Sequence, residues 1–252
     1  MEIIKRPSTH FGERENGARP SFLIIHYTET KNLEDAEDYF LGRREHPNST
    51  EDKKERVSTH YMIDEDGTIV QYVDEDKRAW HAGLSYWAGI KDINSHSIGI
   101  ELVNPGRKYG YRAFPVKQME ALVRLCKDIM SRNTISPFRV LGHSDIAPGR
   151  KSDPGELFDW KMLASAGIGV FPKPNEDDFR VARDYVRDES CLREAFTMAG
   201  YDPSIDLKII IKDFQRHYYP EAFADQDIEQ VGRINETAAA RLHWLIRNRP
   251  NL

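Results

Sequence analysis

The sequence has little cysteine, no long apolar runs and no excess of positive charge, and each shortage argues against a class of protein. Only two cysteines occur, Cys126 and Cys191, so a disulfide framework is not expected. Both lie in helix-like patterns and should be buried thiols. No apolar run approaches the roughly 20 residues that a membrane-spanning helix needs, so no membrane span is expected. The net charge of -5 provides no basic field for nucleic acid.

The first 20 residues are polar and charged, and they lack the apolar segment of a signal peptide. The sequence as given therefore predicts a cytoplasmic protein, and a periplasmic or cell-envelope protein if a leader has been removed. We also expect a monomer.

The 252 residues are enough for one large domain or two smaller ones with a substantial core. Up to residue 170, strand-like and helix-like patterns alternate. The Pro-containing stretch 171–176 predicts a stiff linker, and residues 177–252 are helical in pattern. We therefore predict a domain over 1–170 and a small all-α domain of about three helices plus a connecting helix. His217 and His243 in that domain have no matching carboxylates or cysteines and are expected to be structural or surface groups.

A loop rich in glycine and proline, residues 142–155, holds a histidine, a lysine and an aspartate. A short apolar strand, 138–141, precedes it, and the turns would bring Asp153 back beside His143. These two side chains are two-thirds of a catalytic zinc site, which needs three protein ligands and one open position. His26, at the end of the apolar run 22–27, is the best candidate for the third ligand. A histidine at a strand end is also often only a hydrogen-bonded surface group, and the residues alone leave both possibilities open.

Glu101 stands out in the apolar strand 98–103, because a carboxylate between Ile100 and Leu102 is costly to desolvate unless it is paired or faces a site. A partly buried carboxylate beside a metal has the properties of a general base. Glu101 could also point to solvent from an edge strand.

The segment Ala79-Trp80-His81-Ala82-Gly83 places small residues around a tryptophan and a histidine. Such a combination suits the wall of a groove that stacks on a sugar or a peptide plane. Ordinary aromatic packing explains it almost equally well.

Together these segments resemble the zinc-dependent N-acetylmuramoyl-L-alanine amidases of the amidase-2 family. The resemblance covers roughly residues 20–168, with five blocks in the family's order and approximate spacing. The blocks are Ile24-Ile25-His26-Tyr27-Thr28, Ser58-Thr59-His60-Tyr61-Met62-Ile63 with Asp66-Gly67, Ala79-Trp80-His81-Ala82-Gly83, Asn94 with Ser97-Ile98-Gly99-Ile100-Glu101, and Gly142-His143-Ser144-Asp145-Ile146 to Lys151-Ser152-Asp153-Pro154-Gly155.

The resemblance implies a mixed α/β sheet flanked by helices, the fold of peptidoglycan recognition proteins and of phage amidases of the T7 lysozyme type. It implies zinc bound by His26, His143 and Asp153, with Glu101 and Lys151 as catalytic residues. The substrate-binding residues that it implies are His60, His81, Trp80 and Asn94.

The implied activity is hydrolysis of the amide bond between N-acetylmuramic acid and L-alanine, in peptidoglycan or in soluble muropeptides. A non-catalytic peptidoglycan receptor of the same fold is the alternative. Residues 177–252 resemble, more loosely, a three-helix peptidoglycan-binding domain.

Overall fold

The computed structural model describes residues 1–47, 49–50, 56–224 and 228–250. In these residues six strands form one sheet, in the order β1-β5-β4-β7-β3-β8, and two more form a small ribbon. The strands are β1 (Ile4–Lys5), β2 (Phe11–Glu13), β3 (Phe22–Tyr27), β4 (Tyr61–Ile63), β5 (Ile69–Gln71), β6 (Lys77–Ala79), β7 (Ser97–Leu102) and β8 (Val140–Gly142).

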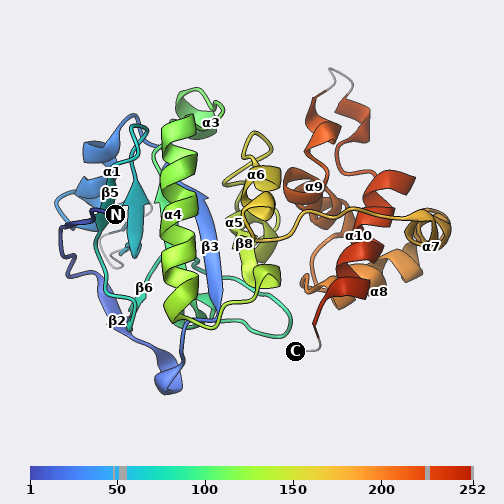
Figure 1. Cartoon of the computed structure of the whole chain (residues 1–252), viewed down its shortest axis with the longest axis horizontal. Helices are drawn as coiled ribbons and strands as arrows, with labels where there is room; N and C mark the ends of the chain where they lie inside the picture. The colour runs from blue at the N-terminus through green and yellow to red at the C-terminus, as the bar shows by residue number, and fades with distance from the viewer. Residues whose placement is uncertain (48, 51–55, 225–227, 251–252) are drawn as a thin grey trace.

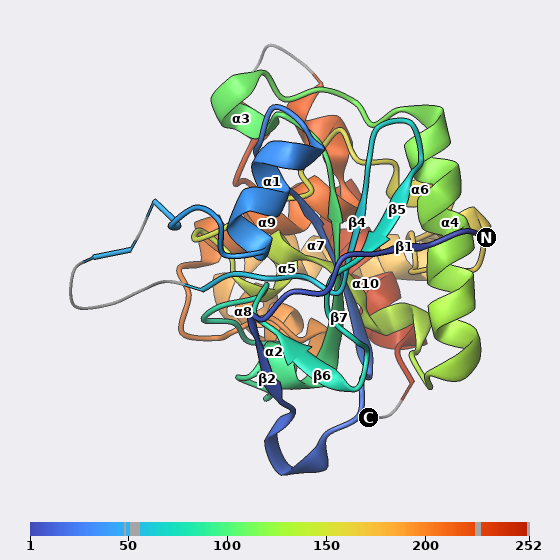
Figure 2. The same ribbon diagram turned by 90° about the vertical axis from the view of Figure 1, so that its left-hand side faces the viewer.

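The helices lie on both faces of this sheet and at its β8 edge (Figures 1 and 2). They are α1 (Leu33–Phe40), α2 (Ile93–His96), α3 (Gly106–Tyr109), α4 (Val116–Arg132), α5 (His143–Ile146), α6 (Trp160–Ser165), α7 (Glu176–Arg187), α8 (Glu189–Ala199), α9 (Leu207–Tyr218) and α10 (Glu236–Asn248). No helix in this part of the chain is long and apolar enough to cross a membrane.

Local signals in the sequence explain the first elements. The Asn32 side chain accepts a hydrogen bond from the Asp35 amide and caps α1, as the sequence predicts. Strands β4 and β5 pair antiparallel across the turn that contains Gly67, whose φ of 92° suits glycine. The two short strands and this turn form a β-hairpin.

The central strand β3 is buried on both faces, because alternate residues serve different layers. Leu23 and Ile25 pack against the apolar stripe of α4. Phe22 and Ile24 point to the opposite face, where they join a cluster formed by the C-terminal helices. His26 is next in that second row, at the point where the apolar cover ends.

The C-terminal helices share a hydrophobic core with the sheet. Leu141 of β8 and Ile146 of α5 lie in the same cluster as Phe196 of α8 and Phe214 of α9. Figure 1 shows α9 beside α5 at the β8 side of the sheet. Helix α7 begins at Glu176, the last residue of the expected linker 171–176, and the helices that follow pack on one face of the main sheet.

One local expectation needs correction. Cys126 is buried as expected, but Cys191 is exposed on α8, because it lies outside the apolar stripe of that helix. The N-terminal segment belongs to the sheets, since β1 pairs with β5 and β2 with β6.

Candidate metal centre and substrate cavity

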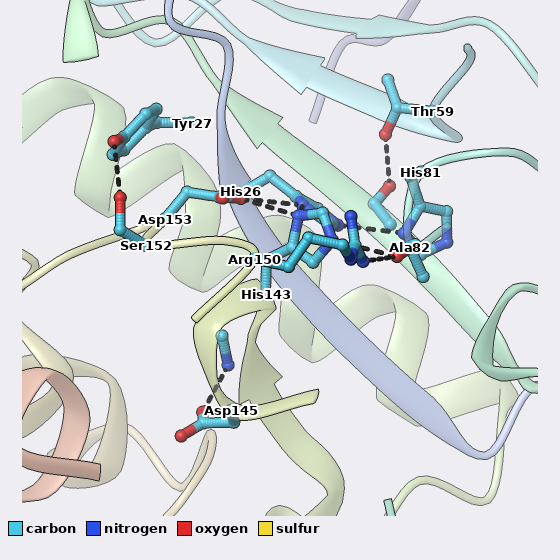
Figure 3. Close-up of polar contacts among 12 residues, drawn as sticks. His26, Tyr27, Thr59, His81, Ala82, His143, Asp145, Arg150, Ser152 and Asp153 are labelled. Atoms are coloured by element: carbon cyan, nitrogen blue, oxygen red, sulfur yellow. Dashed lines mark hydrogen bonds and ion pairs between the residues drawn. The ribbon is translucent and has the colours of Figure 1, made fainter. Parts of the chain in front are cut away.

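Three side chains from distant parts of the chain meet at the carboxyl ends of two adjacent parallel strands. His26 is the penultimate residue of β3 and His143 directly follows β8, where Ile25 pairs with Gly142, so the two histidines lie side by side at one edge of the sheet. His26 Nδ1 lies 3.0 Å from both His143 Nδ1 and Asp153 Oδ2, and His143 Nδ1 lies 3.1 Å from Asp153 Oδ2. Figure 3 shows the three side chains pointing toward one another.

A chain of hydrogen bonds fixes the proton on His26. The Ser97 hydroxyl donates to the Ile93 carbonyl at 2.7 Å, so its oxygen accepts from His81 Nε2 at 3.1 Å. His81 Nδ1 is then an acceptor for His26 Nε2 at 2.9 Å. This network therefore leaves His26 Nδ1 with a free lone pair directed at His143 and Asp153.

A hydrogen bond fixes the tautomer of His143 in the same way. Its Nε2 donates to the Ala82 carbonyl at 3.0 Å, which leaves Nδ1 as an acceptor. Two imidazole lone pairs and a carboxylate oxygen thus face one another without a proton among them. Such a group repels itself unless a cation lies between its members, and two neutral histidines with one carboxylate form a donor set typical of catalytic zinc.

The charge states of the group favour metal binding. Burial lowers the pKa of His26 to about 4, so its imidazole is neutral at pH 7. Burial alone would raise the pKa of Asp153, but electrostatic attraction to His143 and His26 outweighs it and holds that pKa well below its usual range. Neutral imidazole and ionised carboxylate are the forms that bind metal ions.

Glu101 lies beside this centre, in register with His26 on the neighbouring strand β7. The apolar neighbours of Glu101 point to the α4 face, so only Ser97, Gly99 and Glu101 of β7 share the face of His26. One oxygen of Glu101, Oε2, is buried and has no hydrogen-bond partner among the described residues. Burial, reinforced by the nearby Asp153 charge, raises the pKa of Glu101 to about 8, and Lys151 opposes the shift.

A cavity of about 530 Å³ is lined by two of the three candidate ligands, His143 and Asp153, and His26 lies buried directly behind them. Glu101, Lys151, Trp80 and His81 all line it, and Lys151 is exposed there. Its far wall comes from α1, α3 and the loops next to them. The volume is that of a typical small-ligand site.

Comparison with known proteins identifies the family. Residues 16–156 match the family model described as N-acetylmuramoyl-L-alanine amidase. The N-acetylmuramoyl-L-alanine amidase AmiD of Escherichia coli is 36% identical over 237 residues, which is 84% of this chain and 81% of AmiD. This chain belongs to the N-acetylmuramoyl-L-alanine amidase family. The resemblance found in the sequence is thereby confirmed.

One further relative and one solved structure are similar to this chain over different shares of its length. The 1,6-anhydro-N-acetylmuramyl-L-alanine amidase AmpD of Haemophilus influenzae is 38% identical over 63% of this chain and 89% of its own length. The structure of AmpDh3 from Pseudomonas aeruginosa in complex with anhydromuramic pentapeptide has a TM-score of 0.76 and 31% identity, and covers 98% of this chain and 96% of that chain. The mixed α/β fold with flanking helices is confirmed. The family match ends at residue 156, so cell-wall binding by 177–252 stays a prediction.

The structure brings together most, but not all, of the amidase residues expected from the sequence. His60 and Asn94 are buried and are not among the residues that line the cavity. His60 accepts a hydrogen bond from the Gly99 amide, and the Asn94 side chain accepts from the amides of His81 and Ala82. Both side chains therefore support the wall of the site from behind, and neither lines the cavity in this structure.

Sequence reasoning missed several residues of this amidase site. Ser97 and Gly99 lie in the block Ser97-Ile98-Gly99-Ile100-Glu101. Their contacts with His81 follow only from the alternation of side chains in β7 and from the position of His81 over that strand. Arg150 donates to the carbonyls of Ala82 and Leu84 and so joins the loop of His143 to the loop of His81. No local signal distinguishes Arg150 from an ordinary surface arginine.

Proposed function

We propose that this chain is a zinc-dependent hydrolase that cleaves the amide bond between the lactyl group of anhydro-N-acetylmuramic acid and L-alanine in muropeptides. The observation that carries the proposal is the convergence of three lone-pair donors, those of His26, His143 and Asp153, beside an open cavity that the last two line. Membership in the amidase family supports the reaction, and the names of its relatives support the anhydro sugar.

His26, His143 and Asp153 would hold the metal ion. When bound, zinc supplies a Lewis acid that polarises the amide carbonyl and lowers the pKa of water to about 7. His81 and Ala82 keep both imidazoles in the tautomer that presents Nδ1 to the ion.

Glu101 acts as the general base and then as the general acid. Its orphan oxygen accepts a proton from the attacking water as the new C–O bond forms. The same carboxyl then passes that proton to the departing amine of L-alanine as the C–N bond breaks. Because burial raises the pKa of Glu101 and Lys151 opposes that rise, the carboxyl can exchange protons near neutral pH.

Lys151 stabilises the oxyanion that forms when water adds to the carbonyl. It lines the cavity two residues before Asp153, and its ammonium group is exposed. One well-placed donor of this kind contributes on the order of 3 kcal/mol to the transition state.

Metal content and turnover, measured on the same preparations, test these roles. Asp153→Ala is expected to lose zinc and turnover together, because two neutral histidines alone bind the ion weakly. Glu101→Gln is expected to keep zinc and lose roughly 10²- to 10⁴-fold in kcat, because the amide has no proton to exchange. Full turnover in Glu101→Gln would remove the base assignment.

The receptor alternative makes a distinct prediction for the wild-type protein. Mass spectrometry of a digest of soluble anhydromuramyl peptides should show free peptide beginning with L-alanine. Binding of the muropeptide without release of that peptide would support a receptor and contradict the hydrolase.

A further inference from the structure

Helix α9 touches the loop that holds two of the candidate ligands at three points. The loop runs from Gly142 to Glu156 and carries His143 and Asp153. Residues of α9 contact it at positions 145 and 149, which lie between the two ligands, and at position 156, which lies three residues beyond Asp153. The contacting residues are Asp213, Arg216 and His217, which share one face of the helix at spacings of three and four.

The first contact is a fully buried polar node around Asp145. His217 Nδ1 donates to Asp145 Oδ2 at 2.7 Å, and the Tyr201 hydroxyl donates to Oδ1 at 2.9 Å. The Gly142 amide, one residue before His143, donates to the same carboxylate at 2.7 Å. Rings of Trp160 and Tyr218 stack on the two faces of His217, with centroids 3.6 and 3.7 Å away. Because a ring covers each of its faces, the His217 imidazole cannot shift. Its hydrogen bond to Asp145 therefore holds the start of the loop in place.

The second contact holds the middle of the loop. The Gly149 amide donates to Asp213 Oδ2 at 2.7 Å, while Asp213 Oδ1 accepts from Arg216 Nε at 2.9 Å. Gly149 has a φ of 76°, and a side chain on it would meet Ile209 of α9 at 2.8 Å. The backbone here is thus pressed directly against the helix.

The third contact lies just after Asp153. Arg216 Nη1 donates to Glu156 Oε2 at 2.5 Å, and Arg107 Nη2 from α3 donates to the same oxygen at 2.6 Å. Glu156 therefore links α9 to α3, which lies on the opposite side of the cavity.

These contacts use the polar residues of α9 internally. Asp213, Gln215, Arg216 and His217 are all buried, and each is hydrogen-bonded within the chain. Burying charged groups is costly unless their partners are held in place, so this helix is built to fix the loop and does not present these groups to a ligand in solvent.

We propose that α9 acts as a brace for the metal centre, with Asp213 and His217 as positioning residues that hold the loop in the conformation that presents His143 and Asp153. This inference rests on the proposed zinc site. It assigns to part of 177–252 a role inside the amidase centre, separate from any contact with the cell wall.

The full-length protein allows a direct test with Asp213→Ala, in which Gly149 loses its acceptor. Zinc affinity is measured by competition with a chromogenic chelator, and loop mobility by hydrogen exchange of peptides that cover 142–156. We expect the zinc dissociation constant to rise roughly 10- to 100-fold, as for loss of other groups that orient metal ligands. Exchange in the loop should be faster, and KM for a soluble anhydromuramyl peptide should stay unchanged.

Three further variants separate positioning from general damage. Asp213→Asn keeps an acceptor for Gly149 and should recover most of the zinc affinity. Lys212→Ala changes the exposed neighbour on the same helix and should match the wild type. Ile129→Val removes a methylene from the α4 core, on the other face of the sheet, and should lower stability without changing zinc affinity.

If Asp213→Ala does not fold, Asp213→Ser, which is polar but too short to reach Gly149, replaces it in the comparison with Asp213→Asn. Wild-type zinc affinity and loop exchange in the alanine or serine variant would overturn the brace. Equal loss of zinc in Ile129→Val would do the same. Failure of the wild type to bind zinc or to release peptide would instead contradict the proposed function. In that case hydrogen exchange in residues 142–156 would still test whether α9 holds the loop.

Discussion

The two walls of the cavity are held in different ways. The wall that carries His143 and Asp153 rests on buried contacts, with Asp145 and His217 both almost inaccessible to solvent. The opposite wall, formed by α1 and α3, is also anchored from behind by an apolar cluster and the buried Glu37, but the charged side chains that it presents to the cavity are exposed. There Arg44 pairs with Asp38 at 3.0 Å, and Lys31 and Lys108 lie over the Tyr109 ring.

This difference separates metal geometry from substrate contact. Ion pairs on the surface are weak and are screened by salt, so the α1 and α3 wall can adjust to the peptide that binds there. Buried groups that are hydrogen-bonded to one another are costly to disturb, so the wall of the candidate metal centre keeps His143 and Asp153 in place. Changes on the two walls should therefore affect different measurements.

The largest effect is expected from removing residues 171–252. This deletion uncovers Phe22, Ile24 and Leu141, which share a core with the C-terminal helices. We expect residues 1–170 of this chain to lose cooperative unfolding and to aggregate, because a large apolar face meets water. Soluble yield and thermal unfolding measure this. A soluble 1–170 fragment with a cooperative transition and bound zinc would show that the fixed wall does not need the helices.

Next in size is the loss of the buried pair on the fixed wall. His217→Ala leaves Asp145 buried with one donor fewer, and removing one partner of a buried pair costs about 3–5 kcal/mol in the free energy of unfolding. His243→Ala is the control, since His243 is partly buried and hydrogen-bonds the Tyr185 hydroxyl, a contact worth about 1 kcal/mol. Urea denaturation measures both. Similar losses for the two variants would contradict the special role of Asp145.

A smaller and different effect is expected on the open wall. Lys108→Ala removes an exposed cation at the cavity, so KM for an anionic muropeptide should rise roughly two- to fivefold, with kcat and zinc content unchanged. The rise should shrink at high salt. Steady-state kinetics at two ionic strengths checks this. A fall in zinc content would show that the walls are not separate.

The smallest effect concerns an exposed link between the sheet and the helices. Glu221 accepts from Arg241 at 2.8 Å and pairs with Lys161 of α6 at 3.2 Å. Burial raises the pKa of Glu221, but the hydrogen bonds and charge of Arg241 outweigh it and lower the pKa to about 2. Because the folded pKa is depressed, the link stabilises the protein above pH ~4.5, and the contribution is lost as the pH falls from about 4.5 to 2.

The difference in Tm between wild type and Glu221→Gln measured across this pH range tests the link. The difference should be small at pH 6 and should vanish near pH 2. Glu229→Gln, at an exposed glutamate whose partner Arg233 is 4.0 Å away, is the control and should follow the wild type. A constant difference at all pH values would mean that charge at Glu221 is not the cause.

Strong local patterns made much of the fold predictable. The apolar run of β3, the Asn32 cap and the apolar stripe of α4 each specify an element without help from distant residues. Two candidate ligands were predictable for the same reason, since His26 and His143 both come directly after a run of apolar residues. That they meet depends on the parallel pairing of β3 with β8, for which the sequence offers no direct signal.

The remaining features depend on tertiary contacts. His217 looked unpartnered because its carboxylate, Asp145, lies 72 residues away in the other part of the chain. Glu101 looked anomalous because the strand was read as one apolar run, whereas its neighbours face the other layer. The shared core was missed because a Pro-containing stretch suggests separation, yet a linker does not determine what packs on either side of it.

The absence of a side chain at Gly99 has a large structural consequence. At Gly99 a methyl group would sit 2.5 Å from Cγ of the His81 ring, and His81 is the acceptor for His26 Nε2. A single carbon added on β7 would therefore tilt one imidazole and, through it, turn the lone pair of another. The precision of the metal centre is set in part by what the chain leaves out at that position.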